Sequence, residues 1–232
     1  DGKLDIVSNR NLHLWLQGST PTEWQLVELH ALSDAEGLAV GKVDADDLPD
    51  FVVRGYWVRT PADPTNPDAY QRYEIDANVS DSVVLRVADI DQNGTPDVVV
   101  APKEDNISEI DWYSADDPTQ GWTKHTIGPA GFAHEFVVVD FDGNGRPDIV
   151  FAEMSPSPTM RVGAYLQQDS GEWVYFPIAT TGSHNIVVGD LGNDCDFDVL
   201  GANWEAPPVQ IWENHLCDGS GRSCPSSQLD GQ

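Results

Sequence analysis

The sequence has little positive charge. Twelve lysines and arginines stand against 39 aspartates and glutamates, which gives a formal net charge of −27. A surface with this excess of negative charge repels a phosphate backbone, so we expect no nucleic-acid partner. An apolar run long enough to cross a bilayer is also missing, so we expect no membrane partner. No signal peptide is recognisable, and Asp1 falls inside a repeated phrase, so we expect a trimmed piece of a longer, secreted protein.

Cysteine is rare as well, with three residues in the chain. Cys217 and Cys224 flank a short polar loop, which predicts a disulfide within the C-terminal tail, residues 215–232, if the protein is extracellular. Cys195 has no obvious partner in the sequence, so it is either free or paired with a missing segment. Asn-X-Ser patterns at Asn78 and Asn106 add weak support for a secreted glycoprotein.

No stretch shows a convincing helical period, whereas one phrase recurs along the whole chain. Its fullest copies are VADIDQNGTPDVVVAP from Val87 and VVDFDGNGRPDIVFAE from Val138. Shorter or altered copies begin near Asp1, Val40 and Val187. The aspartates that close the phrases follow one another at steps of 45, 47, 51 and 50 residues: Asp5, Asp50, Asp97, Asp148 and Asp198. A period of this size is typical of propellers and solenoids.

Each repeat is predicted to contain four short strands. In the best copy these are residues 135–141, 148–154, 160–167 and 172–179, which combine apolar or alternating patterns with Gly, Pro and Asp breakers. Four strands in about 50 residues correspond to one blade of a β-propeller. The sequence therefore predicts an all-β propeller domain over residues 1–214, whose first blade lacks its innermost strand.

Carboxylates are concentrated in the loops of the two full copies. Oxygen ligands alternate along each loop, and a glycine permits the tight turn. A hard cation such as Ca²⁺ takes six to eight oxygens in irregular cages, and crowded carboxylates without one repel each other. We therefore expect at least two structural calcium ions, although Asx-rich turns without an ion are an alternative. The ligand residues are Asp89, Asp91, Asn93 and Asp97 in one loop, and Asp140, Asp142, Asn144, Asp148 and the Arg146 carbonyl in the other.

Two further loops depart from this pattern. In the last copy, Gly192 and Cys195 replace a carboxylate and the turn glycine, so Asp190, Asp194 and Asp198 are expected to bind calcium more weakly. The copy that runs over residues 44–50 is two residues shorter. It forms either a further metal site or a hydrogen-bonded turn without metal.

These repeats resemble the FG-GAP/VCBS class of propeller repeats, which occurs in integrin heads, fungal lectins and several carbohydrate-active enzymes. The resemblance covers nearly the whole chain, to about residue 214, and rests on the acidic loop followed by Pro-Asp and an apolar strand. It implies a propeller of four-stranded blades with calcium loops. Similar propellers often have seven blades, so we expect the chain to be part of one, completed by a missing segment or another chain. One fold of this kind serves many functions.

The strand directions in such a propeller place other polar residues on the face opposite the metal loops. His134 and His184 both stand six residues ahead of the first loop aspartate, and no such histidine occurs in the other repeats. The predicted substrate contacts around them are Glu135, Asn185, Glu153, Asn203, Trp204 and Trp57. Three alternatives stay open: histidines that only join neighbouring blades, tryptophans that belong to the core, and a zinc site at the histidines.

The resemblance to secreted propeller lyases and sugar dehydratases implies β-elimination on a sugar or acidic polysaccharide. His134 or His184 would be the base, Lys103 or Arg54 would neutralise the acidic group, and Tyr56 would donate the proton. Hydrolysis by paired carboxylates ranks lower. The alternative is a non-catalytic lectin, and a protein-adhesion role is a weaker third possibility. Because the rim residues differ between repeats, one central site is favoured over several equal ones.

Overall fold

The computed structural model describes residues 2–29, 36–104, 108–203 and 209–215. In these ranges the chain consists of β-strands and one short 3-10 helix, η1 (Pro67–Ala69). The strands form five antiparallel sheets, which confirms the predicted all-β class. None of the helical residues in these ranges makes a helix long and apolar enough to cross a membrane.

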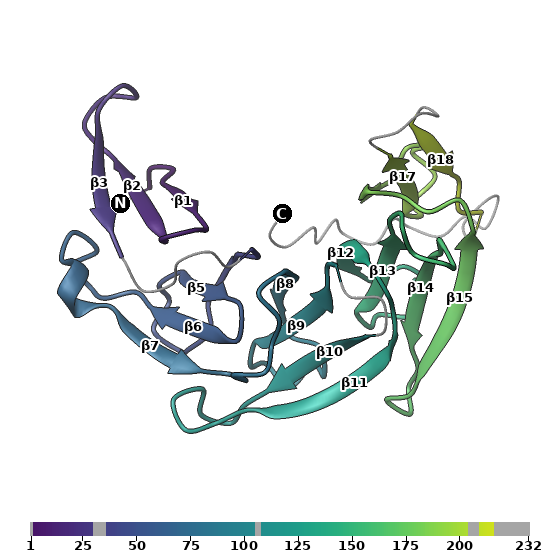
Figure 1. Ribbon diagram of the computed structural model, residues 1–232, viewed down its shortest axis with the longest axis horizontal. Coiled ribbons are helices and arrows are strands. Elements are labelled where there is room, and N and C mark those ends of the chain that lie inside the picture. Colours follow the sequence, from purple (N-terminus) through teal and green to yellow (C-terminus); the bar gives the residue numbers. More distant parts are fainter. Residues whose placement is uncertain (1, 30–35, 105–107, 204–208, 216–232) are drawn as a thin grey trace.

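The five sheets follow one another in chain order around an open arc, and we call them blades 1 to 5 (Figure 1). Blade 1 consists of β1 (Ile6–Ser8), β2 (His13–Gln17) and β3 (Trp24–Glu28). Blade 2 consists of β4 (Ala39–Gly41), β5 (Asp50–Val53), β6 (Tyr56–Arg59) and β7 (Gln71–Glu74). Blade 3 consists of β8 (Val83–Ala88), β9 (Asp97–Pro102), β10 (Glu109–Ser114) and β11 (Thr123–Pro129). Blade 4 consists of β12 (Ala133–Val139), β13 (Asp148–Glu153), β14 (Val162–Gln167) and β15 (Trp173–Ala179). Blade 5 consists of β16 (Asn185–Gly189), β17 (Asp198–Ala202) and β18 (Gln210–Trp212).

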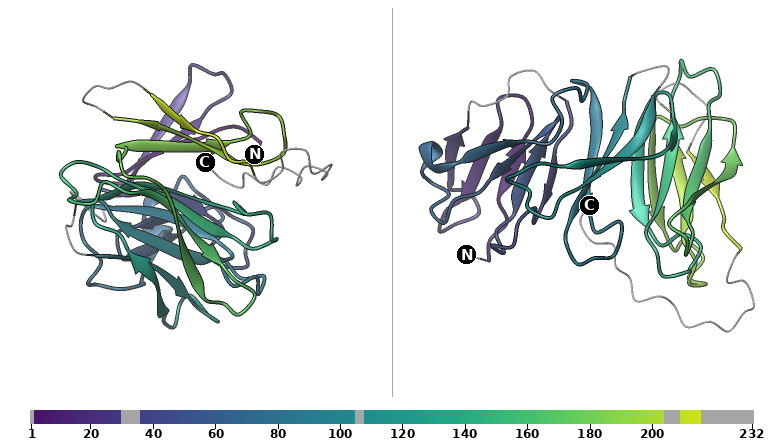
Figure 2. Two further views of the ribbon diagram at one scale, coloured as in Figure 1. Left: turned by 90° about the vertical axis from the view of Figure 1, so that its right-hand side faces the viewer. Right: turned by 90° about the horizontal axis from the view of Figure 1, so that it is seen from below.

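The three complete blades are the four-stranded units that the repeat length predicted. Their strands pair in sequence order, from the innermost strand that begins each repeat to the outermost strand. Asp5 comes just before β1, and Asp50 begins β5, which is the second strand of blade 2. The strands β1, β2 and β3 therefore correspond to strands two to four of a complete blade. Two further views show the same succession of blades from other sides (Figure 2).

Adjacent blades are joined by apolar side chains on their facing surfaces. The second strands β9 and β13 are buried along their whole length, because each is covered on both faces by a neighbouring blade. Phe136 and Phe151 of blade 4 pack against Ile110 and Ile127 of blade 3 in one continuous cluster. Burial of this apolar surface is the main stabilising contribution between blades.

The aspartate that closes each phrase fastens its loop through backbone hydrogen bonds. The Asp148 carboxylate accepts N–H groups from Phe141 and Gln167, both at 2.8 Å. Asp50 and Asp198 make the same two bonds within blades 2 and 5. In blades 2, 4 and 5 one oxygen joins the loop to the second strand and the other joins the third strand. Asp97 of blade 3 makes the loop bond to the Ile90 N–H, and its other oxygen has no partner among the described residues.

Side-chain amides tie neighbouring loops together. Gln167 of blade 4 donates to the Ile90 carbonyl of blade 3 at 3.1 Å, and Gln92 of blade 3 donates to the Gly145 carbonyl of blade 4 at 2.6 Å. The first bond runs from the end of β14 to loop 89–97, and the second runs from loop 89–97 to loop 140–148. The loops of blades 3 and 4 are therefore held in a fixed relation.

Asp50→Ala tests the aspartate that fastens each loop. The substitution leaves the N–H groups of Val43 and Thr60 buried without an acceptor, so we expect unfolding free energy to fall by about 2–4 kcal/mol. Asp47→Asn, at an exposed position of the same loop where asparagine tolerates the φ of 65°, should change it by less than about 0.5 kcal/mol. Urea denaturation measures both, and equal losses would contradict this explanation of the repeat.

Candidate functional site

A pocket of about 510 Å³ lies where the inner parts of all five blades meet. Its lining includes Lys103 after β9, His134 and Glu135 in β12, and Asn185 at the start of β16. These residues were predicted from the sequence to share one rim, and the structure brings them together.

The rings of His134 and His184 are in contact in this region and are tilted against each other. Their ring centroids are 3.9 Å apart with an interplanar angle of 35°. Burial, followed by the nearby Lys103 and His184, lowers the pKa of His134 to about 4. Its Nδ1 is buried and has no hydrogen-bond partner among the described residues. At neutral pH His134 is therefore uncharged and has a nitrogen able to accept a proton.

Basic side chains surround the histidines in two ion-paired groups. Glu36 accepts hydrogen bonds from Lys103 at 3.2 Å and Arg10 at 3.1 Å, and these cations, Lys103 first, lower the pKa of its carboxyl. Arg86 pairs with Glu135 next to His134. Three of the twelve basic residues thus face two carboxylates here, so this region is locally positive within a chain of net charge −27. Such a region attracts anions.

Trp57 is enclosed in the core instead of facing a ligand. Its ring stacks on Tyr73 at 4.7 Å, and its indole N–H donates to the Pro118 carbonyl at 3.1 Å. The side chain has no exposed surface. Trp57 is therefore a core tryptophan, the alternative that the sequence had left open, and not a substrate contact. Its large aromatic ring fills the space between blades 2 and 3.

Glu153 is also withdrawn from the pocket. It is fully buried, and its carboxylate accepts bonds from the Arg161 guanidinium at 2.6 Å and from Ser157 at 2.8 Å. Burial alone would raise the pKa of Glu153, but the hydrogen bonds from Arg161, then Thr159 and Ser157, hold it below its usual range. Glu153 organises the loop that follows β13, and both of its carboxylate oxygens are engaged in hydrogen bonds there.

The remaining predicted residues are scattered. Arg54 pairs with Asp81 at 2.7 Å, and Tyr56 lies beneath the Arg72 guanidinium at 4.7 Å from the ring centroid. Neither is among the residues that line the pocket. Asn203 donates to the Gly182 carbonyl at 3.4 Å, close to His184 in the chain. Trp204 lies outside the described residues.

Glu36 and Arg86 were not predicted as site residues. Arg86 carried a signal that could have revealed it, because it is a charged residue inside the otherwise apolar strand β8. Glu36 reaches the pocket through a parallel bridge to Ser82 in the next blade, which no local pattern indicates.

The acidic loops of blades 3 and 4 form the clusters that the sequence predicted. Carboxylate oxygens of Asp89, Asp91 and Asp97 lie within 4.8 Å of one another, as do those of Asp140, Asp142 and Asp148. One oxygen of Asp97 and one of Asp140 are buried without a hydrogen-bond partner in the described chain. Crowded hard oxygens with spare lone pairs are the donor set that Ca²⁺ prefers, so these residues fit the ion.

The loop of blade 5 differs from those two. Asp190 accepts the N–H groups of Asp194, at 3.1 Å, and Cys195, at 3.2 Å, as Asp89 accepts those of Asn93 and Gly94, so the turn itself is kept. The difference lies in the arrangement of the carboxylates. Within the described ranges, Asp190, Asp194 and Asp198 are not gathered into a cluster of this kind. Cys195 has a φ of 76°, where the fuller loops have glycine, and it is disulfide-bonded. Cys217, Cys224 and the loop predicted between them lie outside the described residues.

Comparison with known proteins agrees with the repeats. Residues 89–151, from the acidic loop of blade 3 into β13, match the sequence profile of the FG-GAP-like repeat. This segment is an FG-GAP-like repeat. No curated protein matches the chain.

Among solved structures, the chain is similar to a Bombyx mori GH32 beta-fructofuranosidase mutant in complex with sucrose. The two share 11% identity with a TM-score of 0.39. The match covers 87% of this chain and 53% of that one, so the chain spans about half the length of that structure.

His134→Gln tests the buried neutral histidine. Because its folded pKa of about 4 lies below the ordinary value of 6.5, the unfolded chain binds more protons between these pH values, and stability falls on acidification. The variant should therefore lose less stability between pH 6.5 and pH 4 than the wild type. Urea midpoints across this range measure the difference, and identical slopes would contradict a depressed pKa.

Proposed function

We propose that the pocket around His134 and His184 binds a sugar that carries a carboxylate, and that the secreted protein acts on it by β-elimination. The observation that carries the proposal is the neutral His134 in ring contact with His184 and beside Lys103, in the locally positive region of a very acidic protein. A lyase or dehydratase needs these three elements: a proton acceptor, a second titratable group and a cation.

In this mechanism the substrate carboxylate lies against Lys103 and Arg10, which now share Glu36. Its negative charge favours the protonated form of His134 and so makes this imidazole a stronger base. His134 removes the proton from the carbon next to the carboxylate, and Lys103 stabilises the enolate charge that develops. The oxygen on the following carbon leaves as the double bond forms. Tyr56 does not line the pocket, whereas the His184 ring contacts the ring of the pocket-lining His134, so we assign the proton for the leaving oxygen to His184.

Calcium ions in the loops of blades 3 and 4 are part of the proposal. Asp89, Asp91, Asn93 and Asp97 would hold one ion, and the corresponding residues of loop 140–148 the other. The ion supplies positive charge that cancels the carboxylate repulsion and fixes the turn. It has no part in the proton transfers assigned to the histidines.

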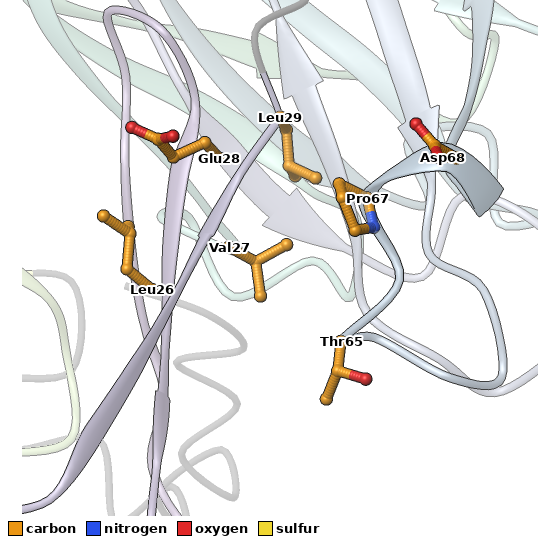
Figure 3. A pocket seen from close by; sticks show the side chains of 7 residues that line it. All are labelled: Leu26, Val27, Glu28, Leu29, Thr65, Pro67 and Asp68. Carbon is orange, nitrogen blue, oxygen red and sulfur yellow. The ribbon is translucent and has the colours of Figure 1, made fainter.

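A lectin is the second candidate, favoured by a pocket between blades 1 and 2. This pocket, of about 500 Å³, lies between β3 and η1. Val27 and Leu29 point toward Pro67, while Thr65 and Asp68 add polar groups (Figure 3). An apolar floor with a few polar groups is the usual composition of a small-ligand site.

An elimination assay separates the two candidates. Incubation with uronic-acid polysaccharides should generate an unsaturated product that absorbs in the ultraviolet. His134→Ala or His184→Ala should reduce the rate by about 10²–10⁴-fold, the usual contribution of general acid–base catalysis. His125→Ala, at a histidine stacked on Trp112 in blade 3, is the control and should retain activity. Glycan binding without product would favour the lectin, and neither binding nor product would overturn both.

Calcium removal tests the metal sites. With free Ca²⁺ at about 100 times its Kd, each site should stabilise the fold by about 2.7 kcal/mol relative to chelator. Asp91→Asn and Asp142→Asn should each reduce this gain, because each removes one charged ligand. Asp116→Asn, at an exposed carboxylate outside the acidic loops, should leave it unchanged. Thermal unfolding with and without chelator measures the effect, and identical curves for the wild type would argue for turns without metal.

A further inference from the structure

The short loop of blade 2 contains carboxylates that face a basic side chain of the same blade. Arg59 Nε lies 2.8 Å from an Asp44 oxygen, and Arg59 Nη2 lies 3.2 Å from an Asp46 oxygen. The Asp44 side chain is only 11% exposed. One guanidinium thus bridges the two carboxylates that correspond to the first two acidic ligands of the longer loops.

The position of Arg59 in its blade explains why it reaches this loop. It is the last residue of β6 and precedes Thr60, whose N–H donates to Asp50. In blade 4 the N–H group that corresponds to that of Thr60 belongs to Gln167 and donates to Asp148. The residue before Gln167, the apolar Leu166, is therefore the equivalent of Arg59. Blade 4 therefore has no cation at the site where blade 2 has a guanidinium.

We infer that Arg59 is the built-in counterion of the blade 2 loop, occupying the role that a bound cation has in blades 3 and 4, and that this loop takes no metal ion. The inference rests on the proposed calcium sites of blades 3 and 4. It answers the alternative that the sequence left open for residues 44–50. A guanidinium presents a rigid fork of donors that can engage two carboxylates at once, which a lysine cannot reproduce.

The energetic argument depends on burial. A fully exposed ion pair contributes little to stability, since water screens both charges. Asp44 is largely shielded, however, and removal of its cation would leave two adjacent carboxylates repelling each other in a confined loop. The loop also lacks the two residues that complete the cage in blades 3 and 4. The shorter loop thus offers fewer oxygen ligands, and the arginine supplies the positive charge. Together these two changes take the place of a bound ion.

The test combines an ion count with thermal unfolding. Calorimetric titration with Ca²⁺ should give Asp46→Asn the same number of bound ions as the wild type, whereas Asp91→Asn should lose one. Arg59→Gln should lower Tm by about 2–4 °C in chelator and in calcium alike. Lys42→Gln is the matched control, because it removes the same charge from an exposed pair with Asp47 in the same loop, and it should shift Tm far less.

The double variant Arg59→Gln with Asp46→Asn should recover part of the lost Tm, because one of the two repelling carboxylates becomes neutral. Loss of a bound ion in Asp46→Asn, or a Tm for Arg59→Gln equal to that of Lys42→Gln, would overturn the inference. Neither readout involves a sugar, so failure here is distinguishable from failure of the proposed elimination. Titration of the wild type reports separately on the calcium sites of blades 3 and 4.

Discussion

The structure depends on placing carboxylates close together at the start of each second strand. In blades 2, 4 and 5 a buried aspartate there accepts backbone N–H groups from its own loop and from the third strand, and so closes the blade. The loops contain further aspartates, and the mutual repulsion of these carboxylates must be cancelled. The blades differ mainly in how this is done: with oxygen clusters suited to an ion in blades 3 and 4, and with an arginine in blade 2.

The scarcity of basic residues makes their positions informative. Arg86 and Lys103 of blade 3 line the inner pocket, and Arg10 of blade 1 is joined to Lys103 through Glu36. Each of the three is paired with a glutamate, and the three cations outnumber the two carboxylates. Within a chain of net charge −27, this region can attract an anion.

The sequence predicted the features that depend on local pattern: the repeats, the four-stranded blades, the acidic clusters and the shared rim of His134 and His184. It could not tell whether Trp57 faces solvent or core, since aromatic rings suit both sites and only the packing of blade 3 against blade 2 decides. Glu153 was misjudged for a related reason, because its partner Arg161 is supplied by the following loop. Glu36 and Arg59 act through contacts across strands or blades, which no local spacing encodes.

Blades 3 and 4 are joined at both ends of their strands. At the acidic loops the amides of Gln92 and Gln167 connect them, and toward the histidines Arg86 pairs with Glu135 while Tyr165 donates to the Pro129 carbonyl. The relative tilt of these two blades is therefore restricted. The two imidazoles come from blades 4 and 5, so their separation depends on the next junction along the arc.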